Sequence, residues 1–282
     1  MEISGKIKEV REISSNWKKQ GLSVALVPTM GYLHAGHISL IEKARKENDK
    51  VIVSIFVNPI QFGPNEDYEK YPRDMDHDAE ACKNAGADLI FAPEPNEMYP
   101  SANLAHVNID QLGDGLCGAR RPGHFSGVCT VITKLFNIVS PDRAYFGQKD
   151  AQQLAIIKKM TGDLNFTTEI VPCRIVREAD GLAMSSRNMY LSPEERSAAV
   201  ILSKSLAMAK QMMEDKESDP ERIKEAVINK IESEPLARID YVEIVDAETL
   251  KQTEHINTPV LTAIAVYIGR TRLIDNFTFK GE

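Results

Sequence analysis

Apolar runs that predict buried strands alternate with segments of helical spacing over the first 177 residues of this chain. Val51–Val57 is a largely β-branched run, and Leu22–Val27 is a second apolar run. Continuous runs of this kind are typical of strands that are covered on both faces. His37–Glu47 and Ser126–Val139 carry apolar residues at helical spacing. The alternation predicts an α/β fold with a doubly wound parallel sheet.

The same reasoning assigns the remaining elements of this region. The further helices are expected over Lys6–Lys19, Asp74–Ala85 and Ala151–Thr161, and the further strands over Asp88–Phe91, Ala144–Phe146 and Glu169–Val176.

The pattern changes after about residue 178. Ser192-Pro193-Glu194-Glu195 combines an N-cap residue with proline at the first helical position, and it predicts a long helix to about Asp215. Asp219-Pro220-Glu221 starts another helix in the same way. Three β-rich runs follow, over Ile239–Val245, Val260–Ile268 and Thr271–Phe279. We therefore expect a Rossmann-like domain over residues 1–177 and a smaller α+β domain with antiparallel strands over residues 178–282.

Composition is that of a soluble globular protein. Of the 282 residues, 43% are hydrophobic and 27% are charged, and the net charge of −7 gives no general attraction to nucleic acid or to an anionic membrane. Because the N-terminus is polar and helix-like over Lys6–Lys19, we expect no signal peptide, and no apolar run approaches the roughly 18 residues needed to span a bilayer. The four cysteines form no Cys-x-x-Cys pair, so we expect thiols in a reducing cytoplasm.

The segment Pro28–His37 joins a predicted strand to a predicted helix and carries two histidines, His34 and His37, expected in the first turn. Residues three apart share a helix face, and a helix N-terminus suits anions such as phosphate. Gly31 and Gly36 let a ligand approach the backbone. The segment predicts a nucleotide phosphate site with two imidazole donors. Metal binding and an ordinary surface pair are the alternatives, although a structural zinc site needs four ligands.

Two further motifs follow predicted strands. The amides of Asn58–Gly63 could bind a polar small molecule, or this segment is a simple turn. In Gly147–Asp150, Lys149 could place a charge on phosphate, while Asp150 either holds a ribose or caps the next helix. One of Gln152 and Gln153 must face the ligand if that helix starts at Asp150.

Three loops carry charged or hydroxyl side chains. Ser185, Ser186 and Arg187, at the expected domain boundary, could clamp a triphosphate. The basic loop at Arg120–Arg121 could attract an anionic substrate or be a solvated loop. Glu66–Arg73 could be a mobile flap or an ordinary loop.

Together these motifs resemble the pantothenate synthetase (pantoate–β-alanine ligase) family, within the HIGH/KMSKS-type nucleotidyltransferases and class I aminoacyl-tRNA synthetases. The similarity covers essentially the whole chain. The His-x-x-His pair is shared across that superfamily, whereas Asn-Pro-x-Gln-Phe and Gly-Gln-Lys-Asp are far more specific to the family. The matching segments are Pro28–His37, Asn58–Gly63, Arg121–Phe125, Gly147–Gln153, Ile175–Asn188 and Leu273–Asn276.

The resemblance implies ATP-dependent condensation of (R)-pantoate with β-alanine through a pantoyl adenylate, releasing AMP and pyrophosphate. The product is pantothenate, which feeds coenzyme A. It also implies a homodimer. We expect Mg²⁺ to be held mainly by the ATP phosphates, with no metal site of the protein's own, because magnesium usually keeps waters and substrate oxygens. From the net charge and the lack of a long apolar run, we expect no nucleic-acid or membrane partner.

The resemblance also assigns roles to residues. His37, His34 and Lys149 would be catalytic, with His37 a proton donor as well. Gln61 and Gln153 would bind pantoate, and Gln61 also β-alanine. The ATP-binding set would be Met30, Gly31, His34, His37, Gly147, Gln148, Lys149, Asp150, Val176, Met184, Ser185, Ser186 and Arg187.

Two other functions are compatible with a nucleotide site. One is a nucleotidylyltransferase that stops at the adenylate or a dinucleotide and lacks the amine-dependent second step, so AMP release that requires β-alanine separates the two. The other is a nucleotide-binding regulator without catalysis. The presence of both histidines, Lys149 and the Ser-Ser-Arg loop argues against a regulator, because binding alone needs no transition-state donors.

Overall fold

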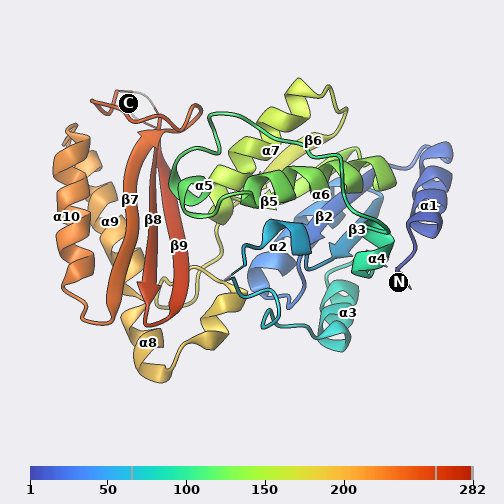
Figure 1. Ribbon diagram of the computed structural model, residues 1–282, viewed down its shortest axis with the longest axis horizontal. Coiled ribbons are helices and arrows are strands. Elements are labelled where there is room, and N and C mark those ends of the chain that lie inside the picture. Colours follow the sequence, from blue (N-terminus) through green and yellow to red (C-terminus); the bar gives the residue numbers. More distant parts are fainter. Residues whose placement is uncertain (65, 258, 281–282) are drawn as a thin grey trace. The chain divides into compact units, whose positions relative to one another are not determined.

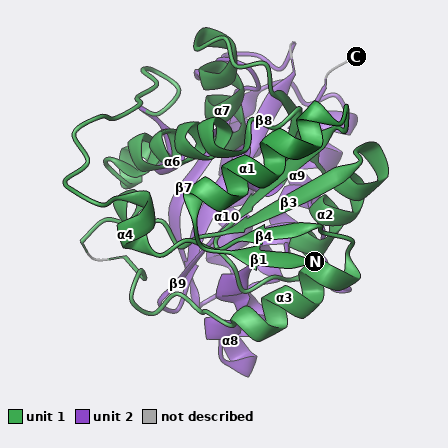
Figure 2. Cartoon of the chain, turned by 90° about the vertical axis from the view of Figure 1, so that its right-hand side faces the viewer, with its two compact units in different colours: residues 1–113, 118–148, 153–174 green, residues 114–117, 149–152, 175–282 purple. Residues whose placement is uncertain are grey.

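The computed structural model describes residues 1–64, 66–257 and 259–280. Asn65, Thr258 and the last two residues, which fall within a predicted loop and the predicted second domain, lie outside the described residues. The chain forms two compact units (Figure 2). The first comprises residues 1–113, 118–148 and 153–174, and the second comprises residues 114–117, 149–152 and 175–282.

The first unit contains a six-stranded sheet whose neighbouring strands are all parallel, in the order β1-β4-β3-β2-β5-β6. This confirms the predicted α/β fold. The strands are β1 (Glu2–Ser4), β2 (Val24–Thr29), β3 (Lys50–Ile55), β4 (Leu89–Phe91), β5 (Arg143–Gly147) and β6 (Glu169–Cys173). The strand order reverses between β2 and β5, and the crevice at such a reversal is where ligands of open α/β sheets bind.

Helices cover both faces of this sheet. Figure 2 shows α1 and α6 on one side and α2 and α3 on the other. Leu40, Ile41 and Ala44 of α2 pack on alternate residues of the central strands and form a core with Cys82 of α3. The helices up to residue 163 are α1 (Ile7–Lys19), α2 (Ala35–Glu47), α3 (Met75–Asn84), α4 (Pro95–Met98), α5 (Leu116–Arg120), α6 (His124–Val139) and α7 (Ala151–Asp163), and the first two residues of α5 and of α7 belong to the second unit.

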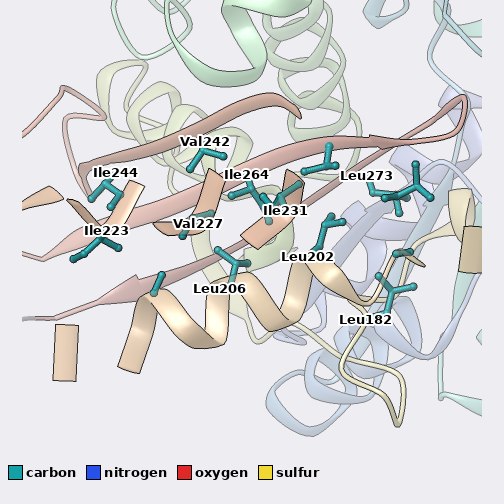
Figure 3. Packing of buried hydrophobic residues seen from close by; sticks show 14 of the residues in the cluster. Leu182, Leu202, Leu206, Ile223, Val227, Ile231, Val242, Ile244, Ile264 and Leu273 are labelled. Atoms are coloured by element: carbon teal, nitrogen blue, oxygen red, sulfur yellow. The ribbon is translucent and has the colours of Figure 1, made fainter. Parts of the chain in front are cut away.

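The second unit is built on an antiparallel sheet, β7-β8-β9, which confirms the predicted α+β character. Its strands are β7 (Ala237–Asp246), β8 (Val260–Ile268) and β9 (Thr271–Phe279), and its helices are α8 (Pro193–Ala198), α9 (Ile201–Glu214) and α10 (Pro220–Glu232). Helices α9 and α10 lie against one face of the sheet (Figure 1). Figure 3 shows Leu202 and Leu206 of α9 and Val227 of α10 packed with Ile264 of β8.

The single long helix predicted from Ser192 to about Asp215 is wrong. The chain forms α8 and α9, separated by a turn at Ala199–Val200. Both turn residues keep helical dihedral angles, but the Leu202 amide donates to the Ala199 carbonyl, three residues back. The helix tightens locally to let Ala199 enter the core, and neither glycine nor proline marks the place.

Strand β1 and the short helices α4 and α5 are absent from the sequence prediction. Only Ser4 of the three β1 residues is buried, so the strand has no apolar run. Its existence depends on pairing with β4, which local periodicity does not encode. Three short 3-10 turns complete the description: η1 (Pro59–Gln61), η2 (Gln148–Asp150) and η3 (Ser186–Tyr190).

Candidate active site

The turn from β2 to α2 is held in an unusual backbone conformation. Gly31 and Tyr32 have φ angles of 84° and 51°, in the left-handed region. The buried carboxylate of Asp78, on α3, accepts hydrogen bonds from the amides of Tyr32 at 2.8 Å and Leu33 at 2.7 Å. A Cβ at Gly31 would lie 2.9 Å from the Asp78 Oδ2 atom, so this turn requires glycine there. The turn delivers the chain to His34.

His34 lies outside the first turn of α2, which corrects the sequence prediction. It is the N-cap residue, with extended dihedral angles, and the helix begins at Ala35. Its Nδ1 atom accepts from the Gly36 amide at 3.1 Å, while its own amide donates to His37 Nδ1 at 3.3 Å. The two rings still lie together, with centroids 4.0 Å apart.

This capping arrangement determines which nitrogen carries the proton in each neutral ring. Because both Nδ1 atoms accept hydrogen bonds, the proton of each neutral imidazole resides on Nε2. His34 and His37 therefore present two N–H donors at the N-terminus of a helix, where the backbone also favours an anion.

Gln61 is oriented by a buried network that starts at Asn58. Asn58 is 1% exposed, and its Nδ2 atom donates to Gln61 Oε1 and to the Gly127 carbonyl, each at 3.1 Å. Tyr99 donates to Asn58 Oδ1 at 2.8 Å, and burial raises the pKa of this tyrosine. Since its oxygen is engaged, Gln61 points its NH₂ group toward Met30, with 3.1 Å between Nε2 and Sδ. Gln61 can thus act as a donor to a ligand.

Helix α6 packs against the turn that contains Gln61. A Cβ on Gly127 would lie 2.5 Å from the Ile60 carbonyl oxygen and 2.6 Å from Gln61 Cα. His124, also on α6, binds the Gln61 carbonyl through Nδ1 at 2.9 Å. The close approach of α6 to η1 therefore depends on a residue without a side chain.

The third segment at this edge of the sheet follows β5. β2, β3 and β5 are neighbours, and their carboxyl ends lead into Met30–His34, Asn58–Gln61 and Gly147–Gln148. Gly147 is half-buried and Gln148 is exposed. The predicted segments of the first unit thus meet at one edge of its sheet, at the strand-order reversal.

Of the two glutamines at the start of α7, Gln152 is used by the backbone. Its side chain accepts from the Cys117 amide at 2.9 Å and donates to the Gly115 carbonyl at 2.9 Å. Gln152 is 6% exposed, whereas Gln153 is half-buried. Asp150 ends the η2 turn and is exposed, and Lys149 is half-buried.

In the second unit, a short hairpin brings Val176 and Met184 together. The Met184 amide donates to the Val176 carbonyl at 3.0 Å, and Gly181 closes the hairpin with a φ of 95°. Beyond it, the Ser185 hydroxyl accepts from the Arg187 amide at 3.2 Å and caps η3, while Ser186 is buried. Two residues of the predicted ATP-binding set are thus adjacent within this unit.

Strand β9 contacts two segments of the second unit that are predicted to lie at the ATP site. The buried carboxylate of Asp275 accepts two hydrogen bonds from Arg177, at 2.6 and 2.9 Å. The neighbouring Asn276 donates to the Lys149 carbonyl at 2.7 Å. The Leu273–Asn276 motif therefore holds the side chain of Arg177 and the backbone of Lys149.

Sequence reasoning missed the supporting residues Asp78, Tyr99 and Gly127. Each lies far along the chain from the residue it supports. No signal in the sequence marked Asp78, because an acidic residue in the first turn of a predicted helix is ordinary, and only the fold shows that it is 1% exposed.

Comparisons with known proteins agree over the full length. The family profile described as pantoate-beta-alanine ligase matches residues 2–278. A curated pantothenate synthetase from Clostridium acetobutylicum is 63% identical over 280 residues, covering 99% of this chain and all of that one. The chain belongs to the pantoate-beta-alanine ligase family.

Solved structures of this ligase family have the same fold. Pantothenate synthetase from Thermus thermophilus superposes with a TM-score of 0.92 at 43% identity, over 98% of this chain and 99% of that one. Pantoate-beta-alanine ligase from Francisella tularensis, complexed with β-γ ATP and β-alanine, gives a TM-score of 0.78 at 36% identity, over 98% and 97% of the two chains.

In residues 1–64, 66–257 and 259–280, no three His, Cys, Asp or Glu side chains group in a way that could hold a metal ion. None of the helices in this part of the chain has the length and apolar character needed to cross a membrane.

Proposed function

We propose that this chain condenses pantoate with β-alanine at the expense of ATP, forming pantothenate, AMP and pyrophosphate. The observation that carries the proposal is the pair of Nε2–H donors at the cap of α2, in a chain that belongs to the ligase family over its whole length. Donors of this kind suit the charge that develops on a phosphate during adenylation.

The first step activates a carboxylate, whose oxygen is otherwise a poor leaving group. A carboxylate oxygen of pantoate attacks the α-phosphorus of ATP, and the bond to the bridging oxygen of pyrophosphate breaks. His34 and His37 donate to phosphate oxygens as negative charge builds. Lys149, Ser185, Ser186 and Arg187 hold the β- and γ-phosphates.

In the second step, the amine of β-alanine attacks the acyl carbon of pantoyl adenylate and AMP leaves. No protein nucleophile is required, so the protein contributes orientation and charge stabilisation. Gln61 and Gln153 bind pantoate, and Gln61 also binds β-alanine. The remaining contacts to ATP come from Met30, Gly31, Gly147, Gln148, Asp150, Val176 and Met184.

We expect Mg²⁺ to enter this site bound to ATP. Magnesium in nucleotide sites usually keeps waters and binds substrate phosphates, so the ATP phosphates would hold most of its coordination. Its contribution is to neutralise phosphate charge. Orientation of the reactants remains the task of the side chains named above.

The assay that tests the function incubates the protein with ATP, Mg²⁺, pantoate and β-alanine, and omits each in turn. We expect pantothenate and AMP in the full mixture, and ATP–pyrophosphate exchange that requires pantoate but not β-alanine. Pyrophosphate release with no β-alanine-dependent release of AMP would indicate a nucleotidylyltransferase. ATP binding without any turnover would indicate a regulator.

Replacing Gln61 or Gln153 by alanine should weaken the use of pantoate far more than ATP binding. Loss of a partner from a buried polar contact costs about 1–3 kcal/mol, or roughly 5- to 150-fold in kcat/KM for pantoate. Initial rates at varied pantoate and varied ATP measure the two effects separately. Gln152→Ala is unsuitable as a control because the Gln152 side chain holds the backbone at Cys117. Gln148 is exposed and is proposed to contact ATP, so Gln148→Ala shows the effect of a variant at the nucleotide subsite. An equal loss of ATP affinity would move Gln61 and Gln153 to the nucleotide subsite.

Gly127→Ala should damage pantoate use although it replaces a helical glycine. In most helices this change stabilises by about 0.4–1 kcal/mol. Here the new methyl group would collide with Ile60 and Gln61, and a displacement of the Gln61 turn by about 1 Å is expected to cost on the order of 10²-fold in kcat/KM.

The matched control for Gly127→Ala is Gly162→Ala, on α7, where an added Cβ meets nothing within 4 Å. Melting temperature and kcat/KM for pantoate are measured on both variants. Normal activity of Gly127→Ala would show that the Gln61 turn tolerates the displacement.

We also propose that the two units have different roles in the reaction. The Rossmann-like unit, predicted as residues 1–177, binds ATP and pantoate, and the smaller unit, predicted as residues 178–282, acts as a lid that brings Arg187 to the triphosphate. Exclusion of water would protect an acyl adenylate that hydrolyses readily. We expect residues 182–190 to gain hydrogen-exchange protection when a non-hydrolysable ATP analogue saturates the protein. Unchanged protection would indicate a rigid, preformed site.

We also propose that the protein is a homodimer and that it is located in the reducing cytoplasm. The four cysteines are free and buried, and burial raises the pKa of the Cys82 and Cys129 thiols to about 12, which keeps them unreactive. Sedimentation equilibrium tests the oligomeric state, since a monomer at micromolar concentration would contradict the dimer.

A further inference from the structure

Arg121 and Glu66 form a bidentate ion pair, and a hydrogen-bonded chain through His124 connects it to the Gln61 turn. The Nε and Nη2 atoms of Arg121 each donate to a different carboxylate oxygen of Glu66, both at 2.6 Å. The side chains are 18% and 24% exposed. Burial acts to raise the pKa of Glu66, but the hydrogen bonds and charge of Arg121 outweigh it and hold that pKa below its usual value. The pair is therefore ionised and partly accessible to solvent.

The guanidinium is positioned independently of Glu66. Its Nη1 atom lies 2.8 Å from His124 Nε2. Arginine can only donate, so this nitrogen accepts, and the proton of His124 resides on Nδ1, which donates to the Gln61 carbonyl at 2.9 Å. A chain of hydrogen bonds thus links Arg121 to the backbone of Gln61. Removal of Glu66 would leave this anchor of the arginine in place.

We propose that Arg121 is the receptor for the carboxylate of β-alanine, and that Glu66 occupies this receptor until the substrate displaces it. The inference rests on the proposed function, because it names a residue for the second substrate. The parallel arrangement of two N–H donors is the geometry in which arginine recognises a carboxylate.

The chemistry of Glu66 matches that of the substrate. Its side chain ends in –CH₂–CH₂–COO⁻, and β-alanine is the same fragment with an ammonium group at the other end. A tethered carboxylate of this shape competes with free β-alanine at an effective concentration in the millimolar range. Glu66 also keeps the charge of Arg121 compensated while β-alanine is absent, which avoids a partly buried, unpaired cation.

Steady-state kinetics on variants of the full chain test the proposal. Arg121→Gln should raise the KM for β-alanine by roughly 10- to 150-fold, the effect of losing a hydrogen-bonded charged partner. ATP–pyrophosphate exchange, which needs no β-alanine, should change far less. Glu66→Gln, which keeps the shape of the side chain, should lower the KM for β-alanine by on the order of tenfold because the competitor loses its charge.

Two ligands separate recognition of a carboxylate from general damage. Propionate, which lacks the amine, should inhibit competitively with β-alanine, and more strongly in Glu66→Gln. With 3-aminopropan-1-ol, which keeps the amine but lacks the carboxylate, kcat/KM should be equally low for the parent and for Arg121→Gln. If Arg121→Gln lowered kcat/KM for both amines by the same factor, Arg121 would be structural and the proposal would fail.

The remaining outcomes are also decisive. Arg143→Gln removes another arginine–glutamate pair of the first unit, at the amino end of β5, and should leave the KM for β-alanine unchanged. An unaltered KM for β-alanine in Glu66→Gln would show that Glu66 does not compete with β-alanine for Arg121. Absence of pantoate-dependent pyrophosphate exchange in the parent would overturn the proposed function itself. Normal exchange in the parent, together with an unchanged KM for β-alanine in Arg121→Gln, would overturn this inference alone.

Discussion

His37→Ala should lower the rate of pantoyl adenylate formation by about 10²–10³-fold, the usual effect of losing one transition-state donor. The Nδ1 atom of His37 accepts a hydrogen bond from the His34 amide, so the proton of the neutral ring lies on Nε2, the group proposed to stabilise phosphate charge. ATP–pyrophosphate exchange in the presence of pantoate measures this step directly. His34→Ala should act similarly, but it also removes the cap of α2 and therefore lowers stability.

A control for His37 separates its capping role from its catalytic role. In His37→Asn, the amide oxygen can replace Nδ1 as the acceptor of the cap, while the donor at the position of Nε2 is lost. We expect His37→Asn to melt at nearly the parental temperature and still to exchange pyrophosphate slowly. Rapid exchange by this variant would remove His37 from the catalytic set.

Lys149→Ala should slow adenylation by about 10²–10³-fold while leaving the second step largely intact. The lysine carries the positive charge proposed to face the departing pyrophosphate, and pyrophosphate takes no part in the attack by β-alanine. Supplying preformed pantoyl adenylate with β-alanine, and following AMP, isolates that second step.

The fold around Lys149 should survive this substitution. Asn276 holds the carbonyl of residue 149, and alanine keeps this carbonyl. Lys158→Ala, at an exposed position on α7, is the matched loss of a lysine and should behave like the parent. A Lys149→Ala variant that also failed with preformed adenylate would indicate a role in holding the structure.

Local periodicity was sufficient for the elements with a strong apolar pattern. The run at Val51–Val57 corresponds to β3 at Lys50–Ile55, and the stripe at Ser126–Val139 corresponds to α6 at His124–Val139. It failed where tertiary contacts decided the outcome. The turn at Ala199–Val200 follows the demands of a core that the sequence does not display locally, and β1 exists only because β4 is beside it.

The candidate site shows the same distinction. The positions of Gly31, His34 and His37 after a strand and at a helix start indicated an anion site without knowledge of the fold. The hydrogen bonds that orient these groups come from distant segments, such as Asp78 below the β2–α2 turn and Tyr99 beside Asn58. A single sequence does not identify such partners, since hydrogen bonding between remote residues leaves no periodic trace.

The contacts made by β9 have a consequence for the order in which the enzyme matures during its synthesis. Asp275 and Asn276 are separated by 98 and 127 residues from the segments that they hold, at Arg177 and Lys149. Contacts over such separations form slowly, and a ribosome produces the amino-terminal part of a chain first. The parallel sheet of the first unit can therefore assemble while translation continues. The anchoring of Lys149 and Arg177 must wait until β9 has been released, so ATP-dependent activity should be the last property that a nascent chain acquires.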